Sequence, residues 1–200
     1  MIVFGLTGGI ASGKTTITNF LKKKKFAVHD SDIVVKNMYS KLPPSFKNYL
    51  RSINLEDAIK GTTVNKNLIR KEIFNNQSKK RKLEKFIHKE VKKSRTRFLK
   101  KHKKKKTKIV ILDIPLLFEA KLNYICDYII LLYLPKKLKI QRALVRKGMT
   151  KNILLKIIKN QLSDAYKKKR ADFVINTSRT KSHSFKMILE KISNIMNDYA

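Results

Sequence analysis

The sequence predicts an α/β fold of three layers, with helices on both faces of a parallel sheet. The first observation is a short apolar run from Ile2 to Leu6, which is typical of a strand buried on both faces. The second is the order of the next segments: a glycine-rich loop, a helical stretch from Lys14 to Lys24, and a short strand from Phe26 to Val28. This order predicts a βαβ unit, whose two strands run parallel.

The second half of the chain supplies further elements for the same sheet. Helical stretches are expected from Pro135 to Lys147 and, with Thr150 as a cap, up to about Leu162. Strand patterns occur at Ile109 to Ile114, Tyr128 to Leu134 and Phe173 to Ile175. The last helix is expected to pack on the core through an apolar stripe of Phe185, Ile188, Leu189, Ile192, Met196 and Tyr199.

Between these parts lies a segment without strand patterns, from about Ile33 to Lys106. It is predicted to be helical, with breaks at Pro43–Pro44 and near Gly61. Its longest helix has an apolar stripe beneath a nearly all-basic face and ends in the run Lys103 to Lys106. The stripe consists of Leu83, Phe86, Ile87, Val91, Phe98 and Leu99. We expect a helical insertion in the α/β core, with its lysines facing solvent.

Composition excludes several classes of protein. The longest apolar stretch, Tyr124 to Leu134, contains Asp127 and is too short to cross a bilayer. The N-terminal stretch lacks the basic start, apolar segment and cleavage site of a signal peptide. Cys126 is the only cysteine, so no internal disulfide forms. We therefore expect a cytoplasmic protein that does not bind membranes.

The formal net charge is +34, from 48 lysines and arginines against 14 acidic residues. Proteins that bind nucleic acids place arginine and aromatic residues among their lysines, whereas runs such as Lys22 to Lys25 contain neither. The charge predicts attraction to an anionic substrate and no specific nucleic-acid partner, although AT-rich codon usage would by itself supply an excess of lysine over arginine. Nothing in the sequence implies an obligate protein partner.

The glycine-rich loop carries a phosphate-binding motif. Residues Gly8 to Thr15 read GGIASGKT and fit the P-loop (Walker A) pattern, with the required strand before them and helix after them. Backbone amides of such a loop, and the start of its helix, bind phosphate oxygens. Lys14 places a charge near the transferred phosphate, Thr15 can bind a Mg²⁺ that bridges the β- and γ-phosphates, and Thr16 can contact the α-phosphate. The motif predicts ATP and Mg²⁺ as ligands.

Two carboxylate sites are expected at the carboxyl edge of the sheet, where open α/β sheets bind ligands. Asp30 and Asp32 come directly after the second strand, and either could orient or deprotonate an attacking hydroxyl. The alternative is that one of them caps the helix that begins at Ile33. Asp113 ends the third strand, in the position of a Walker B carboxylate that holds Mg²⁺. Its alternative role is a structural cap for the next turn.

Taken together, these segments resemble the dephospho-CoA kinase family, which acts in the last step of coenzyme A biosynthesis. The resemblance runs almost from end to end. It is carried by the segments LTGGIASGKTT, HDSDIVVK, IRKEIFNNQSKKRKLEKFIHK, DIPLLFEAKL, QRALVRKGMT and ADFVIN. It implies a kinase that transfers phosphate from ATP, with Mg²⁺, to the ribose 3′-hydroxyl of dephospho-CoA, giving coenzyme A and ADP.

The resemblance also implies roles for individual residues. Asp32 would be the catalytic carboxylate beside the acceptor hydroxyl, with Asp30 as its accessory neighbour. Lys14 and Arg142 would be catalytic as well, since the Arg142 guanidinium can clamp γ-phosphate oxygens as charge moves. The implied ATP site is Gly9, Ala11, Ser12, Gly13, Lys14, Thr15, Thr16, Arg142 and Arg146; the acceptor site is Asp32, Arg70 and His88; the metal site is Thr15 and Asp113.

The whole chain, residues 1–200, is expected to form a single P-loop kinase domain. The core would take residues 1–35, 107–140 and 172–200, a helical CoA-side subdomain about 36–106, and a lid about 141–171. Three features depart from the family's usual pattern. Lys89 follows His88 where proline is common, no glycine follows Asn176-Thr177-Ser178, and the segment from Lys167 to Arg170 is more basic.

Other functions are consistent with parts of the same pattern. One alternative is another type of small P-loop kinase, which acts on a nucleoside-monophosphate-like acceptor. Such a kinase would share the loop but not the combination of Asp30 and Asp32 with the PLLFE segment. A basic nucleic-acid-binding ATPase would fit the charge, but an aromatic stacking surface is missing. A GTPase is disfavoured, because the nearest string to its base-reading Asn-Lys-x-Asp element, Asn65 to Leu68, lacks the acid.

Overall fold

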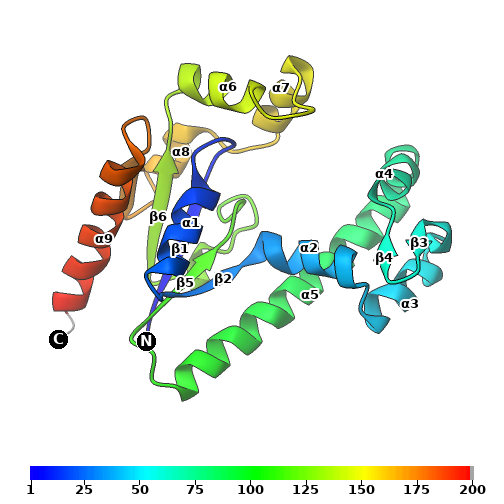
Figure 1. The fold of residues 1–200 in the computed structure, drawn as a ribbon, viewed down its shortest axis with the longest axis horizontal. Coiled ribbons are helices and arrows are strands. Elements are labelled where there is room, and N and C mark those ends of the chain that lie inside the picture. Colours follow the sequence, from blue (N-terminus) through cyan, green and yellow to red (C-terminus); the bar gives the residue numbers. More distant parts are fainter. Residues whose placement is uncertain (199–200) are drawn as a thin grey trace. The chain divides into compact units, whose positions relative to one another are not determined.

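A computed structural model describes residues 1–198. The chain divides into two compact units, one of residues 1–30 and 102–200 and the other of residues 31–101. The first unit contains a five-stranded parallel sheet in the order β2-β5-β1-β6-β7 (Figure 1). Its strands are β1 (Ile2–Gly8), β2 (Ala27–Asp30), β5 (Ile109–Asp113), β6 (Tyr128–Tyr133) and β7 (Phe173–Asn176). The predicted α/β fold with a parallel sheet is confirmed.

The central strands are buried because nearly all their side chains are apolar. All five residues of β5 are buried, and β1 pairs with β5 on one side and with β6 on the other. Gly5 of β1 is required by close packing, since a Cβ there would lie 2.7 Å from the Cys126 sulfur and 2.8 Å from Leu117 Cδ1. Continuous burial explains why these strands show uninterrupted apolar runs in the sequence.

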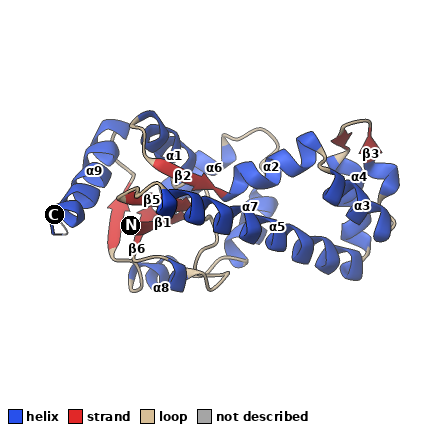
Figure 2. Ribbon diagram, turned by 90° about the horizontal axis from the view of Figure 1, so that it is seen from below, coloured by secondary structure: helices blue, strands red, loops and turns tan. Residues whose placement is uncertain are grey.

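Helices flank both faces of this sheet. Figure 2 shows α1 and α8 on opposite sides of it. On one face, Phe20 of α1 stacks on Phe185 of α9 with ring centroids 3.9 Å apart, and both helices pack on the core through Leu21 and Ile188. The helices of this unit are α1 (Lys14–Lys23), α6 (Lys136–Leu144), α7 (Lys151–Lys159), α8 (Asp164–Lys168) and α9 (Lys181–Asp198), with a 3-10 turn at Asn123–Ile125.

One detail of the helix predictions was confirmed and another corrected. The Thr150 hydroxyl accepts a hydrogen bond from the Ile153 amide at 3.3 Å, so Thr150 caps α7 as expected. In α9, Ile195 is buried and Met196 is 37% exposed, so Met196 was wrongly assigned to the packed stripe. After Ile192 the helical repeat allows either residue to face the core, and the geometry selects Ile195. Tyr199 lies outside the described residues.

The second unit is mostly helical, with a core that includes Phe46, Leu50 and Leu83. Its helices are α2 (Ser31–Lys41), α3 (Pro44–Ser52), α4 (Lys66–Asn75) and α5 (Gln77–Lys104) as far as residue 101, with a 3-10 turn at Glu56–Ala58. The expectation of a segment without strands was wrong, because β3 (Ile59–Lys60) and β4 (Thr63–Val64) pair as a hairpin. Gly61 supplies a positive φ of 57° for the turn. Strands of two residues are too short to show an alternating pattern.

None of the helices within residues 1–198 is long and apolar enough to span a membrane.

Candidate active site

The P-loop connects β1 to α1 at the carboxyl edge of the sheet. Gly8 has no room for a side chain, because a Cβ would lie 2.5 Å from Ser12 Oγ and 2.8 Å from the Leu132 carbonyl oxygen. Ala11 and Gly13 both have positive φ, 61° and 83°. Gly13 is the N-cap of α1 and provides no side-chain cap, so no side chain competes for the amides at the start of the helix. The loop therefore has the backbone shape that phosphate binding needs.

The buried Ser12 hydroxyl provides a test of whether a phosphate fits. Ser12 is 1% exposed, and its Oγ atom has no hydrogen-bond partner among the described residues. A buried hydroxyl without a partner is costly unless a ligand or water completes it. A phosphate oxygen can accept a hydrogen bond from such a hydroxyl, so the loop contains a donor that a phosphate-bearing ligand could use.

Lys14 and Asp113 form a buried ion pair. Lys14 Nζ donates to Asp113 Oδ1 at 2.8 Å, and the Thr18 hydroxyl donates to Asp113 Oδ2 at 2.6 Å. Burial raises the pKa of the Asp113 carboxyl above its ordinary value, while the Lys14 charge and the two hydrogen bonds act in the opposite direction. Thr18 was not predicted, although it lies one helical turn after Lys14, the spacing that places two side chains on one face.

A cavity of about 340 Å³ adjoins the P-loop. It is lined by the predicted ATP-site residues Ala11, Gly13, Thr16, Arg142 and Arg146, together with Thr177. Arg179 and Lys181 add two further cations, and no carboxylate lines it among the described residues. The structure thus brings the expected arginines to the same cavity as the loop, in a positively charged setting that suits a polyanion.

An ion pair with a buried lysine lies beside the start of the loop. A Cβ on Gly9 would lie 3.4 Å from both Lys139 Nζ and Gln161 Oε1. Lys139 is 7% exposed and donates to Asp164 at 2.6 Å. The sequence contained no signal for this pair, because lysine is abundant throughout the chain.

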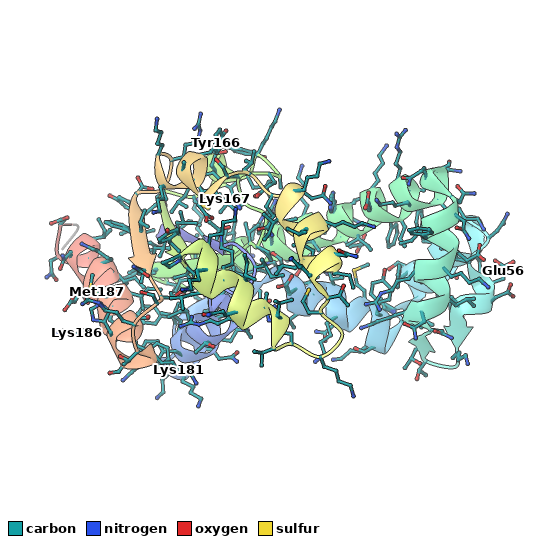
Figure 3. The ribbon with its side chains drawn as sticks, turned by 90° about the horizontal axis from the view of Figure 1, so that it is seen from above. Glu56, Tyr166, Lys167, Lys181, Lys186 and Met187 are labelled. Carbon is teal, nitrogen blue, oxygen red and sulfur yellow. The ribbon has the colours of Figure 1, made fainter. Side chains whose placement is uncertain are left out.

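A second ion pair of this kind joins α8 to the segment after β5. Lys167 pairs with Glu119 at 2.6 Å, and Glu119 also accepts from the Leu162 amide at 3.0 Å. Lys167 is only 1% exposed, whereas its neighbour Tyr166 is 38% exposed; Figure 3 labels both on α8. Lys167 therefore neutralises a buried carboxylate and does not contribute to the basic surface of Lys167 to Arg170 that the sequence suggested.

Asp30 and Asp113 end neighbouring strands, as expected for the carboxyl edge. They are register partners in β2 and β5. Asp30 forms an ion pair with Lys22 of α1 at 2.8 Å. Asp32 lies two residues further on, in the first turn of α2, and belongs to the second unit. The two aspartates of the DSD segment therefore have different surroundings.

The second unit has a cavity of its own, of about 420 Å³. Its lining includes Asp32, Lys36, Tyr39, Lys66 and Arg70. Burial raises the pKa of the Tyr39 hydroxyl, and the nearby Arg70 charge opposes this rise. The structure thus places two of the predicted acceptor-site residues, Asp32 and Arg70, in one cavity with three side chains that sequence reasoning missed.

His88, the third predicted acceptor residue, is not brought to this cavity. It lies on α5, which continues as a helix through Lys89. The lysine in place of proline therefore leaves the helix uninterrupted, and a role for His88 stays a prediction.

Comparison with known proteins identifies the family. The dephospho-CoA kinase family matches residues 2–182. Dephospho-CoA kinase of Fusobacterium nucleatum is 32% identical over 94% of this chain and 95% of its own, and that of Bartonella quintana is 31% identical over 99% and 100%. A dephospho-CoA kinase structure from Campylobacter jejuni, at 22% identity, covers 99% of this chain and 98% of its own with a TM-score of 0.71 and shows the same fold. The chain therefore belongs to the dephospho-CoA kinase family.

Proposed function

We propose that the protein transfers the γ-phosphoryl group of ATP to the ribose 3′-hydroxyl of dephospho-CoA, giving coenzyme A and ADP. The observation that carries this proposal is a P-loop with a cationic cavity beside it, in a chain that matches the family over residues 2–182. The alternative acceptors of other small P-loop kinases, and a nucleic-acid-dependent ATPase, lack comparable support.

The donor nucleotide is assigned to the first unit. The loop amides and the Ser12 hydroxyl bind phosphate oxygens, and Lys14 exchanges its Asp113 partner for the transferred phosphate. Arg142 and Arg146 line the same cavity, where a guanidinium can neutralise the charge that moves during transfer. Catalysis of this kind depends on position and charge, since the protein forms no covalent bond to the phosphoryl group.

A Mg²⁺ ion fits the side chains near the loop. The Thr15 hydroxyl and the Asp113 carboxylate offer oxygen ligands, which Mg²⁺ prefers. No group of three or more His, Cys, Asp or Glu side chains suited to a metal occurs in residues 1–198, and Mg²⁺ in kinases is commonly held by one or two protein oxygens plus substrate phosphates. Held by Thr15 and Asp113, a Mg²⁺ ion would supply positive charge that neutralises the charge developing on the phosphates.

The acceptor is assigned to the second unit. Asp32 is proposed to orient the 3′-hydroxyl and accept its proton. Lys36, Lys66 and Arg70, which line the cavity with it, offer positive charge to the diphosphate of dephospho-CoA. This support is local, because the cavity is built entirely from residues of one unit.

The segment about 141–171 is proposed as a lid. It contains Arg146 and the end of α6, and closure over the nucleotide would exclude water, the competing acceptor. The two ion pairs of Lys139 with Asp164 and of Lys167 with Glu119 anchor the C-terminal part of this segment.

A direct assay tests the proposal. The purified chain is incubated with Mg²⁺ and ATP labelled in the γ-phosphate, and label is followed into dephospho-CoA, 3′-deoxy-dephospho-CoA and AMP. We expect transfer to dephospho-CoA alone. Asp32→Asn should abolish most of it, and Asp57→Asn, an exposed aspartate of the same unit, serves as the charge-matched control. Transfer to AMP in preference to dephospho-CoA would refute the assignment of the acceptor.

A further inference from the structure

Thr177 is a buried residue in the cavity beside the P-loop that no part of the proposed mechanism yet uses. It directly follows β7 and is 6% exposed. Its backbone amide donates to the Tyr133 carbonyl at 2.9 Å, which extends the pairing of β7 with β6 by one residue. The backbone of Thr177 is thus held by the sheet, independently of its side chain.

The Thr177 side chain reaches the P-loop itself. Its hydroxyl donates to the Ser12 carbonyl at 2.9 Å, in a buried contact between residues 165 positions apart in the sequence. The same hydroxyl also lies 3.2 Å from the Tyr133 carbonyl. A hydroxyl has a single proton to donate, and the Tyr133 carbonyl already accepts the Thr177 amide. Removing the hydroxyl would therefore break the shorter contact, to the Ser12 carbonyl, whereas the Tyr133 carbonyl would keep its hydrogen bond from the Thr177 amide.

The Ser12 carbonyl belongs to the peptide group that carries the Gly13 amide. Because a trans peptide is planar, its C=O and N–H point in opposite directions, so holding the carbonyl fixes the direction of the Gly13 N–H. Gly13 has a φ of 83° and no side chain to restrict it, which leaves this peptide free to rotate unless a neighbour holds it. Thr177 is that neighbour.

Thr177 also contacts a second part of the nucleotide site. Its carbonyl accepts a hydrogen bond from Arg142 Nη1 at 3.0 Å, and both residues line the cavity with Gly13. One residue at the end of β7 thus holds a P-loop peptide through its side chain and an arginine of α6 through its backbone. The two contacts can be separated by mutation, because a change of side chain leaves the carbonyl in place.

We propose that Thr177 is a positioning residue for the nucleotide: its hydroxyl orients the Ser12–Gly13 peptide so that the Gly13 amide is preset for phosphate. This inference rests on the proposed function only in taking the ligand to be ATP or ADP. The hydroxyl touches no reacting atom, and its effect should appear in nucleotide affinity and not in acceptor affinity.

The test compares Thr177→Val with Thr177→Ser. Valine keeps the branched shape and both backbone contacts but removes the hydroxyl, while serine retains the hydroxyl. We expect Thr177→Val to raise the Kd for ADP, measured by calorimetry, and the KM for ATP about tenfold, with the KM for dephospho-CoA changed by less than about twofold. Serine should restore nucleotide binding to within about threefold of the parent.

Thr7→Val is the matched control. Thr7 is also a buried threonine of the first unit, 1% exposed, and its hydroxyl donates to the Pro115 carbonyl at 3.0 Å. The Thr7→Val variant should lose thermal stability to a similar extent as Thr177→Val, but its Kd for ADP should not rise. If Thr177→Val does not fold, Thr177→Ala makes the same comparison with less steric demand. Faster hydrogen exchange over residues 9–16 in the folded variant is the expected structural signature.

Several results would overturn the proposal. These are an unchanged Kd for ADP in the folded valine or alanine variant, equal impairment of the serine and valine variants, or equal increases in both KM values. A parent protein that binds ADP but does not phosphorylate dephospho-CoA would contradict the proposed function and leave the Thr177 test intact through calorimetry. A parent protein that does not bind ADP would contradict both.

Discussion

The buried pair of Lys14 and Asp113 allows a prediction about the thermal stability of the protein that can be tested independently of phosphoryl transfer. The side chains are 12% and 1% exposed, so Lys14→Met leaves a carboxylate that water can hardly reach. Breaking a buried ion pair by removing one partner costs about 3 kcal/mol. In a domain of this size each kcal/mol lowers Tm by roughly 3 °C, so a decrease of roughly 9 °C near pH 7 is expected.

The cost of Lys14→Met should depend on pH in a defined direction. Burial already raises the pKa of Asp113 in the folded protein, and loss of the opposing Lys14 charge raises it further. A carboxyl whose folded pKa exceeds its unfolded value destabilises the protein progressively as pH rises from the unfolded value through the folded one. The decrease in Tm should therefore be smaller at about pH 5 than at about pH 7, because Asp113 can take up a proton at the lower pH.

The double variant Lys14→Met, Asp113→Asn provides the internal control. A neutral amide needs no cation and can still accept from Thr18, so most of the lost stability should return. Unfolding is followed by far-UV circular dichroism, since the chain contains no tryptophan. Phosphoryl transfer should stay absent in both variants. A pH-independent decrease in Tm, or no recovery in the double variant, would refute the assignment of a charged, desolvated Asp113.

Three further predictions concern the proposed reaction and the ion pair of Lys167. Asp32→Asn should lower kcat by about 10² to 10⁴ with the KM for ATP unchanged, as steady-state kinetics will show, and a normal kcat would exclude Asp32 from the catalytic step. Arg142→Lys should lower kcat despite its retained charge, because the planar fork is lost; kinetics equal to the parent would place Arg142 outside the site. Lys167→Met should lower Tm by leaving Glu119 buried without its cation, while Lys169→Met, at a nearby exposed lysine, should not; equal Tm values for the two variants would contradict the buried pair.

The sequence predicted most of the first unit because its signals are local. A strand buried on both faces is an apolar run, and the P-loop needs glycine at positions where a side chain would collide, as at Gly8. The hairpin at Gly61 was missed, since strands of two residues carry no period. Met196 was misplaced for the opposite reason: the helical period was clear, but it did not decide between Met196 and the neighbouring Ile195, which is the buried one.

The same distinction between local and long-range signals applies to the candidate site. By itself, the sequence determined the phosphate-binding loop, its ATP chemistry and the family, because these depend on residue types at fixed short spacings. Only the tertiary structure decided that Asp113 holds Lys14 and Thr18, that Lys167 is buried against Glu119, and that Thr177 reaches the Ser12 carbonyl. These contacts join residues up to 165 positions apart, which meet because of the order of strands in the sheet. No local sequence pattern encodes such pairings. In a chain so rich in lysine, no pattern distinguishes the few lysines whose charge is buried from those that face solvent.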